Sequence, residues 1–109
     1  MKDDKFAKEG LTRELAIRAL RGVIDPEVGI NIVDLGLIYN VTVDADRLEV
    51  RMGLTSPACP MGNRMVEEAR ELVQAIMQYS MEVDVKLVWD PPWNPQMMSD
   101  KAKQLLGWR

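Results

Sequence analysis

The sequence has no histidine and only one cysteine, Cys59, in 109 residues. Without histidine there can be no Ser-His-Asp or Cys-His pair, no histidine-ligated zinc site and no imidazole acid or base. A single cysteine can neither form an internal disulfide nor supply a metal site built from four thiolates. Sulfur nucleophile or thiolate chemistry in this chain therefore depends on Cys59, and a reducing compartment is its natural setting.

Long apolar runs and basic blocks are also missing. No segment approaches the roughly 18 continuous apolar residues of a membrane span, and the first residues are charged where a signal peptide would be apolar. The chain has 14 basic and 17 acidic side chains, a net charge of −3, with no basic stripe for phosphates. We therefore expect a cytoplasmic protein that binds neither nucleic acid nor a membrane.

The length predicts one domain of ordinary globular composition. Residues 1–10 are polar and charged, and we interpret them as a flexible tail ahead of a single domain over residues 11–109. Thr12 is the expected N-cap of a first helix. Asp25-Pro26 should end this helix, because a residue that precedes proline avoids helical backbone. Its apolar positions are Ala16, Ala19, Leu20, Val23 and Ile24.

Three segments alternate between apolar and polar residues with the period of two that is typical of strands. They span residues 37–44, 48–55 and 81–89, and the first two form a hairpin around residues 44–47. In the first segment we expect Tyr39 to lie on the same face as Leu37, Val41 and Val43. In the third we expect Trp89 to face inward with Met81, Val83, Val85 and Leu87.

The strongest helical pattern lies between the second and third strands. Its apolar stripe consists of Met65, Val66, Ala69, Leu72, Val73, Ile76 and Met77. Ser99 should cap a short last helix with Ala102, Leu105 and Leu106 on its apolar side. The order helix, strand, strand, helix, strand, helix predicts an α/β (α+β) two-layer sandwich, with a three-stranded mixed sheet and helices on one face.

Cys59 lies in the stretch 54–60, which joins the second strand to this helix. Pro60 suits the first helical position, which would place Cys59 beside the N-cap, where unpaired backbone N–H groups favour the thiolate. We expect the pKa of the Cys59 thiol to lie moderately below its ordinary value. The loop residues that we expect to support this thiol are Thr55, Ser56, Pro57 and Pro60. A buried, inert cysteine is the alternative.

Three acids, Asp25, Glu27 and Asp34, occur between the first helix and the first strand. They could supply oxygen ligands to a cation or receive a basic partner. They could equally be turn residues that hydrogen-bond their own loop, and the sequence favours this second interpretation.

The stretch 89–95 places Trp89 and Trp93 around Pro91 and Pro92. Such a stiff aromatic segment could form a surface for a partner protein. The alternative is a rigid lid that packs both tryptophans onto the end of the sheet.

Together these motifs resemble the PaaD/SufT family of iron–sulfur cluster assembly proteins, over roughly residues 12–109. The residues that carry the resemblance are Asp25-Pro26-Glu27, Val33-Asp34-Leu35-Gly36-Leu37-Ile38-Tyr39, Leu54-Thr55-Ser56-Pro57-Ala58-Cys59-Pro60, Trp89-Asp90-Pro91-Pro92-Trp93 and the ending from Met98-Ser99-Asp100-Lys101 to Leu106-Gly107-Trp108. The resemblance implies a small domain like the C-terminal domain of NifU-type proteins. It places the family's reactive cysteine at Cys59 and its acidic signature at Asp25 and Glu27.

The implied function is that of a non-enzymatic assembly factor, an adaptor or transient carrier of iron or a cluster through Cys59. Clusters are typically held by four cysteines, or by two cysteines and two histidines, so one chain cannot hold one stably. A cluster would be shared between the Cys59 thiolates of a homodimer or with outside thiols. The implied partners are iron–sulfur assembly proteins and client apoproteins. Two alternatives are an accessory, PaaD-like subunit for a ring-hydroxylating oxygenase and a thiol enzyme with Cys59 as nucleophile.

Overall fold

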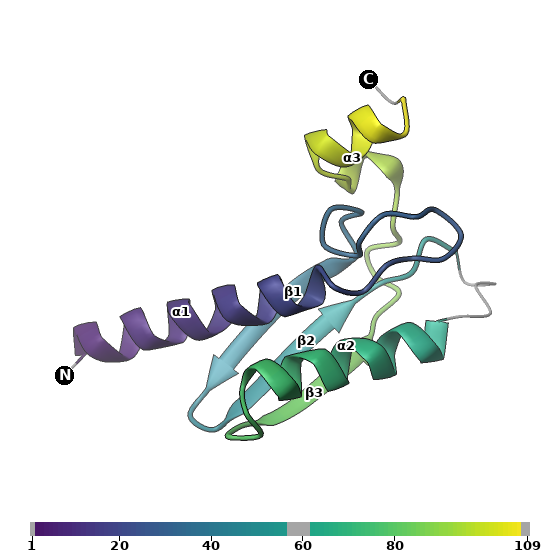
Figure 1. The fold of residues 1–109 in the computed structure, drawn as a ribbon. Coiled ribbons are helices and arrows are strands. Elements are labelled where there is room, and N and C mark those ends of the chain that lie inside the picture. Colours follow the sequence, from purple (N-terminus) through teal and green to yellow (C-terminus); the bar gives the residue numbers. More distant parts are fainter. Residues whose placement is uncertain (1, 57–61, 108–109) are drawn as a thin grey trace.

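The computed structural model describes residues 2–56 and 62–107, with side chains from Lys8 onward (Figure 1). The elements in chain order are α1 (Lys2–Leu20), β1 (Ile38–Asp44), β2 (Arg47–Met52), α2 (Gly62–Ile76), β3 (Glu82–Leu87), the 3-10 helix η1 (Pro95–Met97) and α3 (Asp100–Leu105). This order of helices and strands confirms the prediction. None of the helices within the described ranges is long and apolar enough to cross a membrane.

The sheet is mixed, as predicted, with strand order β1-β2-β3. β1 and β2 form an antiparallel hairpin in which Asp44 lies opposite Arg47. β3 runs parallel to β2, from Glu82 opposite Arg47 to Leu87 opposite Met52. α1 and α2 pack against each other and over the sheet, whereas α3 lies beyond its end (Figure 1).

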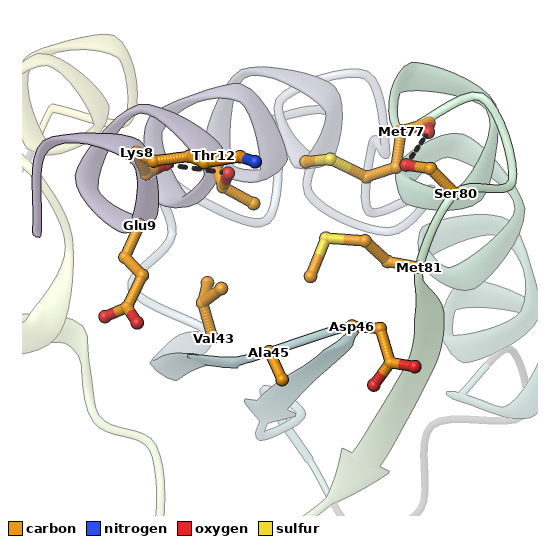
Figure 2. A pocket seen from close by; sticks show the side chains of 9 residues that line it. All are labelled: Lys8, Glu9, Thr12, Val43, Ala45, Asp46, Met77, Ser80 and Met81. Carbon is orange, nitrogen blue, oxygen red and sulfur yellow. Dashed lines mark hydrogen bonds between the residues drawn. The ribbon is translucent and has the colours of Figure 1, made fainter. Parts of the chain in front are cut away.

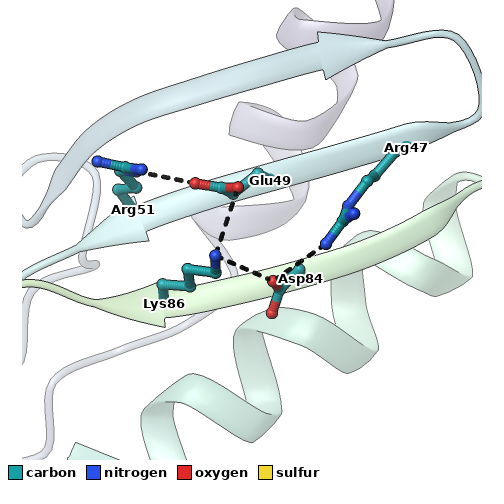
Figure 3. Close-up of polar contacts among 5 residues, drawn as sticks. All are labelled: Arg47, Glu49, Arg51, Asp84 and Lys86. Carbon is teal, nitrogen blue, oxygen red and sulfur yellow. Dashed lines mark hydrogen bonds and ion pairs between the residues drawn. The ribbon is translucent and has the colours of Figure 1, made fainter.

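The period-two alternation decides which face of the sheet belongs to the core. In β2 the even-numbered residues 48, 50 and 52 are fully buried, while the odd-numbered residues form ion pairs on the open face (Figure 3). The buried apolar residues form one cluster: Ala16, Leu20, Val23, Ile30, Ile32, Leu35, Leu37, Val41, Leu48, Val50, Met52, Leu54, Met65, Ala69, Val73, Met77, Val83, Val85, Met98 and Ala102.

α1 differs from the prediction at both ends. It begins at Lys2, so residues 2–10, expected to be a flexible tail, are helical instead. Thr12 lies inside the helix, where its hydroxyl donates to the carbonyl of Lys8 at 2.8 Å. The Lys, Ala and Glu residues of this segment have high intrinsic helix propensity, which a search for apolar spacing does not detect. The helix ends at Leu20, and Ile24, expected in its apolar stripe, is exposed in the following loop.

β1 contains a bulge that the alternation did not predict. Ile38 pairs with Met52 and Asn40 with Arg51, so β1 has one residue more than β2 here, and Tyr39 has no opposite residue. Ile38 therefore shares the core face with its buried partner Met52, which corrects the predicted side. Tyr39 is correspondingly absent from the packed core.

The ends of other elements also differ from expectation. β3 stops at Leu87, so the alternation does not continue to Trp89, which is 53% exposed instead of facing inward. Ile76, at the end of α2, and Leu105 and Leu106, in and after α3, are exposed rather than buried. Ser99 caps α3 as predicted, with its hydroxyl accepting from the N–H of Ala102 at 3.1 Å.

Candidate functional site

The segment between α1 and β1, called the acidic loop below (residues 23–36), buries one of its three acids. The loop closes on itself at a bridge between Ile24 and Asn31, and the N–H of Asp25 donates to the carbonyl of Ile30 at 3.0 Å. The side chain of Asp25 is fully buried. Its Oδ1 accepts from the N–H of Glu27 at 2.9 Å, but its Oδ2 is buried with no hydrogen-bond partner among the described residues.

Glu27 and Asp34 have different surroundings. Glu27 is exposed, whereas Asp34 is half-buried and its Oδ2 accepts from the side-chain amide of Asn31 at 2.7 Å. This bond holds the pKa of Asp34 below its ordinary value, helped by a hydrogen bond from Ser99 and opposed by burial. Asp34 thus acts as a turn residue. Across residues 8–56 and 62–107, whose side chains are described, no three His, Cys, Asp or Glu side chains form a group that could hold a metal ion.

The acidic loop packs against the beginning of α2. A hollow of about 250 Å³ lies between them, lined by Ile24, Pro26, Arg64, Met65 and Glu68. The residues on both sides of Asp25 and the first two turns of this helix therefore border the same hollow. Cys59 precedes the helix start at Gly62 by three residues in sequence, but Cys59, Pro57 and Pro60 lie outside the described residues.

A second hollow, of about 300 Å³, opens at the carboxyl ends of β2 and β3. The residues that line it, called the aromatic groove below, are Tyr39, Leu54, Thr55, Val88, Trp89, Pro91, Pro92 and Trp93. Parallel strands end at the same edge of a sheet, so the chain after β2 and the chain after β3 meet here. The groove thus brings the tryptophan–proline segment 89–93, the expected partner surface, next to Thr55 of the loop expected to support Cys59. Ser56 follows Thr55 and is half-buried.

The acidic loop also holds the wall of this groove in place. The indole Nε1 of Trp93 donates to the carbonyl of Leu35 at 2.6 Å. Gly36 has a φ of +79°, and a Cβ there would lie 2.2 Å from the carbonyl oxygen of Met97. A side chain at position 36 would therefore separate the loop from η1. This close approach explains why the motif of residues 33–39 contains a glycine at this point.

Tyr39 is a groove residue that the sequence pattern misplaced. The bulge directs it into the groove, where its ring and hydroxyl lie against Gly53; a Cβ at position 53 would come within 2.5 Å of the hydroxyl. Burial raises the pKa of Tyr39, so the hydroxyl stays protonated at neutral pH. This hydroxyl has no hydrogen-bond partner in the described part of the chain. A glycine at the end of a strand was the one local signal of such a close approach.

A larger hollow, of about 440 Å³, lies at the other end of the sheet and contains none of the predicted site residues (Figure 2). Its two hydroxyls are bonded to nearby backbone: Thr12 to the carbonyl of Lys8 and Ser80 to that of Met77, at 2.8 and 2.6 Å. The polar groups therefore do not converge on a ligand position, and volume alone does not identify a site.

Comparisons with known proteins agree with the motifs. Residues 13–87 match the family model described as "Iron-sulfur cluster assembly protein". The chain is 43% identical over 97 residues to the Fe-S protein maturation auxiliary factor of Porphyromonas gingivalis, covering 88% of this chain and 91% of that protein. It is 45% identical over 86 residues to the Fe-S protein maturation auxiliary factor SufT of Staphylococcus aureus, covering 78% and 97%.

The fold also has a solved counterpart. The crystal structure of a domain of unknown function, DUF59, from Bacillus anthracis matches with a TM-score of 0.88 at 36% identity, covering 94% of this chain and 98% of that one. The family match spans well over half of the sequence, from α1 to the end of β3, and includes the acidic loop and Cys59. The chain therefore belongs to the family of iron–sulfur cluster assembly proteins, the family that its motifs predicted.

Proposed function

We propose that this protein is a non-enzymatic auxiliary factor in iron–sulfur protein maturation, which uses Cys59 as a transient ligand or exchange thiol. In this proposal the Asp25 carboxylate lies beside the working thiol, and the aromatic groove binds the partner protein. Family membership supports the general role. The roles proposed for Asp25 and for the aromatic groove rest on the two hollows. One hollow is bounded by the acidic loop and α2, and the other by the ends of β2 and β3.

The observation that carries the proposal is Oδ2 of Asp25, which is buried without a partner in the described ranges. An unsatisfied buried carboxylate oxygen is destabilising by a few kcal/mol, and such groups are commonly kept for a ligand or a reaction. The flanking residues Ile24 and Pro26 line one hollow with residues in the first turns of α2, the helix that Cys59 precedes in sequence. We infer that this oxygen meets the Cys59 thiol or the iron that the thiol receives.

The count of thiols decides how iron could be held. Iron–sulfur clusters typically need four cysteine ligands, and this chain has one. Iron or a cluster on Cys59 is therefore shared with thiolates of another chain and leaves by ligand exchange. This role needs a reduced thiol, which is consistent with a cytoplasmic location.

The aromatic groove suits an apolar or aromatic side chain of a client apoprotein or assembly partner. Exposed tryptophan and proline side chains bind extended peptide segments through rigid apolar contacts. Because Thr55 lines the groove and lies four residues before Cys59, a segment bound here is next to the connection that carries the thiol.

The test is complementation of a host that lacks its own copy of the gene, with the activity of a [4Fe–4S] enzyme as the measurement. Cys59→Ser should reduce this activity to that of the empty-vector strain, with unchanged thermal unfolding of the purified protein. Asp25→Asn, which keeps the shape of the side chain, should lower the activity in part. Glu71→Gln, an exposed change on α2, is the control and should rescue fully.

Anaerobic reconstitution with iron and sulfide supplies the second measurement. Wild type should show cluster absorption that is lost on adding a competing thiol chelator, and Cys59→Ser should show none. Full cluster-enzyme activity in the Cys59→Ser strain would contradict the proposed thiol role.

A further inference from the structure

The sheet has two edge strands, and α1 covers only one of them. At β1, the guanidinium Nε of Arg13 on α1 donates to the carbonyl of Val41 at 3.0 Å. β3 forms the other edge, at the margin of the sheet (Figure 1). Within the described part of the chain, the elements that β3 contacts extensively are β2 on one side and α2 on one face. With respect to residues 2–56 and 62–107, the outer side of β3 is therefore an open strand edge.

The backbone groups at this edge follow from the parallel pairing with β2. Glu82 donates to the carbonyl of Asp46 and Val88 to that of Met52, both at 2.8 Å. In a parallel ladder alternate residues bond to the same neighbour, so the even-numbered residues of β3 face β2. Residues 83, 85 and 87 direct their N–H and C=O groups outward, and none has a backbone partner among residues 2–56 and 62–107. Such a row is a template for another strand.

Two opposite charges of β3 lie one residue to either side of Val85. Asp84 and Lys86 flank it on the open face, where Asp84 lies 3.7 Å from Arg47 and 3.8 Å from Lys86 (Figure 3). Lys86 also lies 3.7 Å from Glu49. Charges on an edge strand normally discourage pairing with other strands. Asp84 and Lys86, however, have opposite signs and lie equally far from Val85. An identical antiparallel strand can therefore pair with β3 when the twofold axis passes through Val85.

We propose that β3 pairs antiparallel with β3 of a second copy of this chain, about a twofold axis at Val85, and joins the two three-stranded sheets into one. In this register Asp84 lies opposite the partner's Lys86, twice by symmetry. On the helix-covered face, Val83 lies opposite the partner's Leu87 and Val85 opposite the partner's Val85. Outward-facing N–H and C=O groups of residues 83, 85 and 87 then bond across the axis.

The neighbouring registers are disfavoured by the same charges. A shift to an axis at residue 84 places Asp84 opposite the partner's Asp84, although it also places Lys86 opposite the partner's Glu82, and a shift to residue 86 places Lys86 opposite the partner's Lys86. Of these three registers, only the axis at Val85 pairs opposite charges without a like-charge pair. Like charges directly opposite each other destabilise strand pairs, whereas opposite charges stabilise them. A second copy therefore fits this edge better than an unrelated strand. The inference does not depend on the role of Cys59.

Charge exchange tests this register with the full-length chain. Sedimentation equilibrium should give wild type a mass that rises with concentration from 12.4 kDa toward twice that value. Asp84→Lys and Lys86→Asp each place two like-charge pairs at the axis and should weaken the dimer about tenfold or more. The double variant D84K/K86D restores opposite charges and should dimerise like wild type. Glu82→Lys, an exposed change outside the charge pairs, is the control and should not alter dimerisation.

A mixture of the two single variants provides the most stringent test, because both charge pairs of the heterodimer are then opposite in sign. At one pair Asp84→Lys of one chain faces Lys86→Asp of the other, and at the second pair the unchanged Lys86 faces the partner's unchanged Asp84. The mixture should form a heterodimer with about wild-type affinity, whereas each variant alone should form its homodimer about tenfold or more weakly. Circular dichroism of each single variant establishes that it is folded. A wild type that stays monomeric up to about 0.5 mM, within the affinity range of weak complexes, would overturn the proposal. So would dimerisation that the single charge changes leave unaltered, or a partner strand from another protein on the edge of a monomer.

Discussion

Replacing Gly36 with alanine tests how the aromatic groove is held in place. A Cβ at this position would lie 2.2 Å from the carbonyl oxygen and 2.6 Å from the carbonyl carbon of Met97. Both atoms belong to backbone, so η1 must move away from the acidic loop to admit the methyl group. This movement also pulls Trp93 from the carbonyl of Leu35, which its indole contacts at 2.6 Å.

Gly29 supplies a matched control for the magnitude. It lies in the same loop with the same φ of +79°, but a Cβ there would meet nothing within 4 Å. Gly29→Ala therefore measures the left-handed backbone alone, which destabilises a residue with a Cβ by about 1–2 kcal/mol. Gly36→Ala adds the lost indole hydrogen bond, about 1 kcal/mol, and the displaced packing of buried Met98. We expect a loss of about 3 kcal/mol or more for Gly36→Ala, against about 1–2 kcal/mol for Gly29→Ala.

The assay is urea unfolding followed by circular dichroism, with the native-state tryptophan fluorescence measured on the same samples. Gly36→Ala should shift the emission to longer wavelength, because the indole of Trp93 becomes more exposed to water. Gly29→Ala should leave the emission unchanged. Equal losses of unfolding free energy in the two variants, with equal emission, would refute the close approach of Gly36 to Met97 as the constraint on the groove.

Two further predictions concern binding and pH. Trp89→Ala should weaken partner binding at least tenfold in calorimetric titration, because an aromatic anchor is lost. Tyr79→Ala removes another exposed aromatic side chain that lies outside the groove, and it should leave binding unchanged. Equal effects of the two variants would exclude the groove as the docking site. Because hydrogen bonds from Asn31 and Ser99 lower the pKa of Asp34, its ionised form stabilises the fold above the unfolded pKa of 3.8, and this contribution is lost as pH falls through the lower folded pKa. The unfolding free energies of wild type and Asp34→Asn should therefore converge between about pH 6 and about pH 2, and a constant difference would contradict this role.

The strands and α2 were predictable because their signal is local. Residues 48–52 and 83–87 alternate between the core and the open face, and the apolar stripe of α2 has the helical period. At these positions the spacing of the buried residues, two for a strand and about 3.6 for a helix, is enough to tell a strand from a helix. The N-terminal half of α1 lacks such a stripe, so apolar periodicity does not reveal that it is helical.

The candidate site was predictable in its members but less in its arrangement. The motifs identified the Trp89–Trp93 segment and Asp25, yet no spacing indicated that Asp25 is fully buried with Oδ2 lacking a partner in the described ranges. Strict alternation places Tyr39 on the core face because it assumes equal numbers of residues on paired strands. The bulge breaks that assumption, and it becomes visible only when β1 is aligned with β2.

By itself, the sequence determined the order and type of the elements, the family, and the dependence of thiolate chemistry on Cys59. These properties follow from composition, from period and from motifs contained in short stretches of chain. Only the tertiary structure decided that Gly36 adjoins Met97, that Thr55 and Trp93 share a groove, and that β3 keeps an open edge with Asp84 and Lys86 about Val85. Each of these depends on which segments distant in sequence are neighbours in space, a choice made by strand register and helix packing that local patterns do not encode.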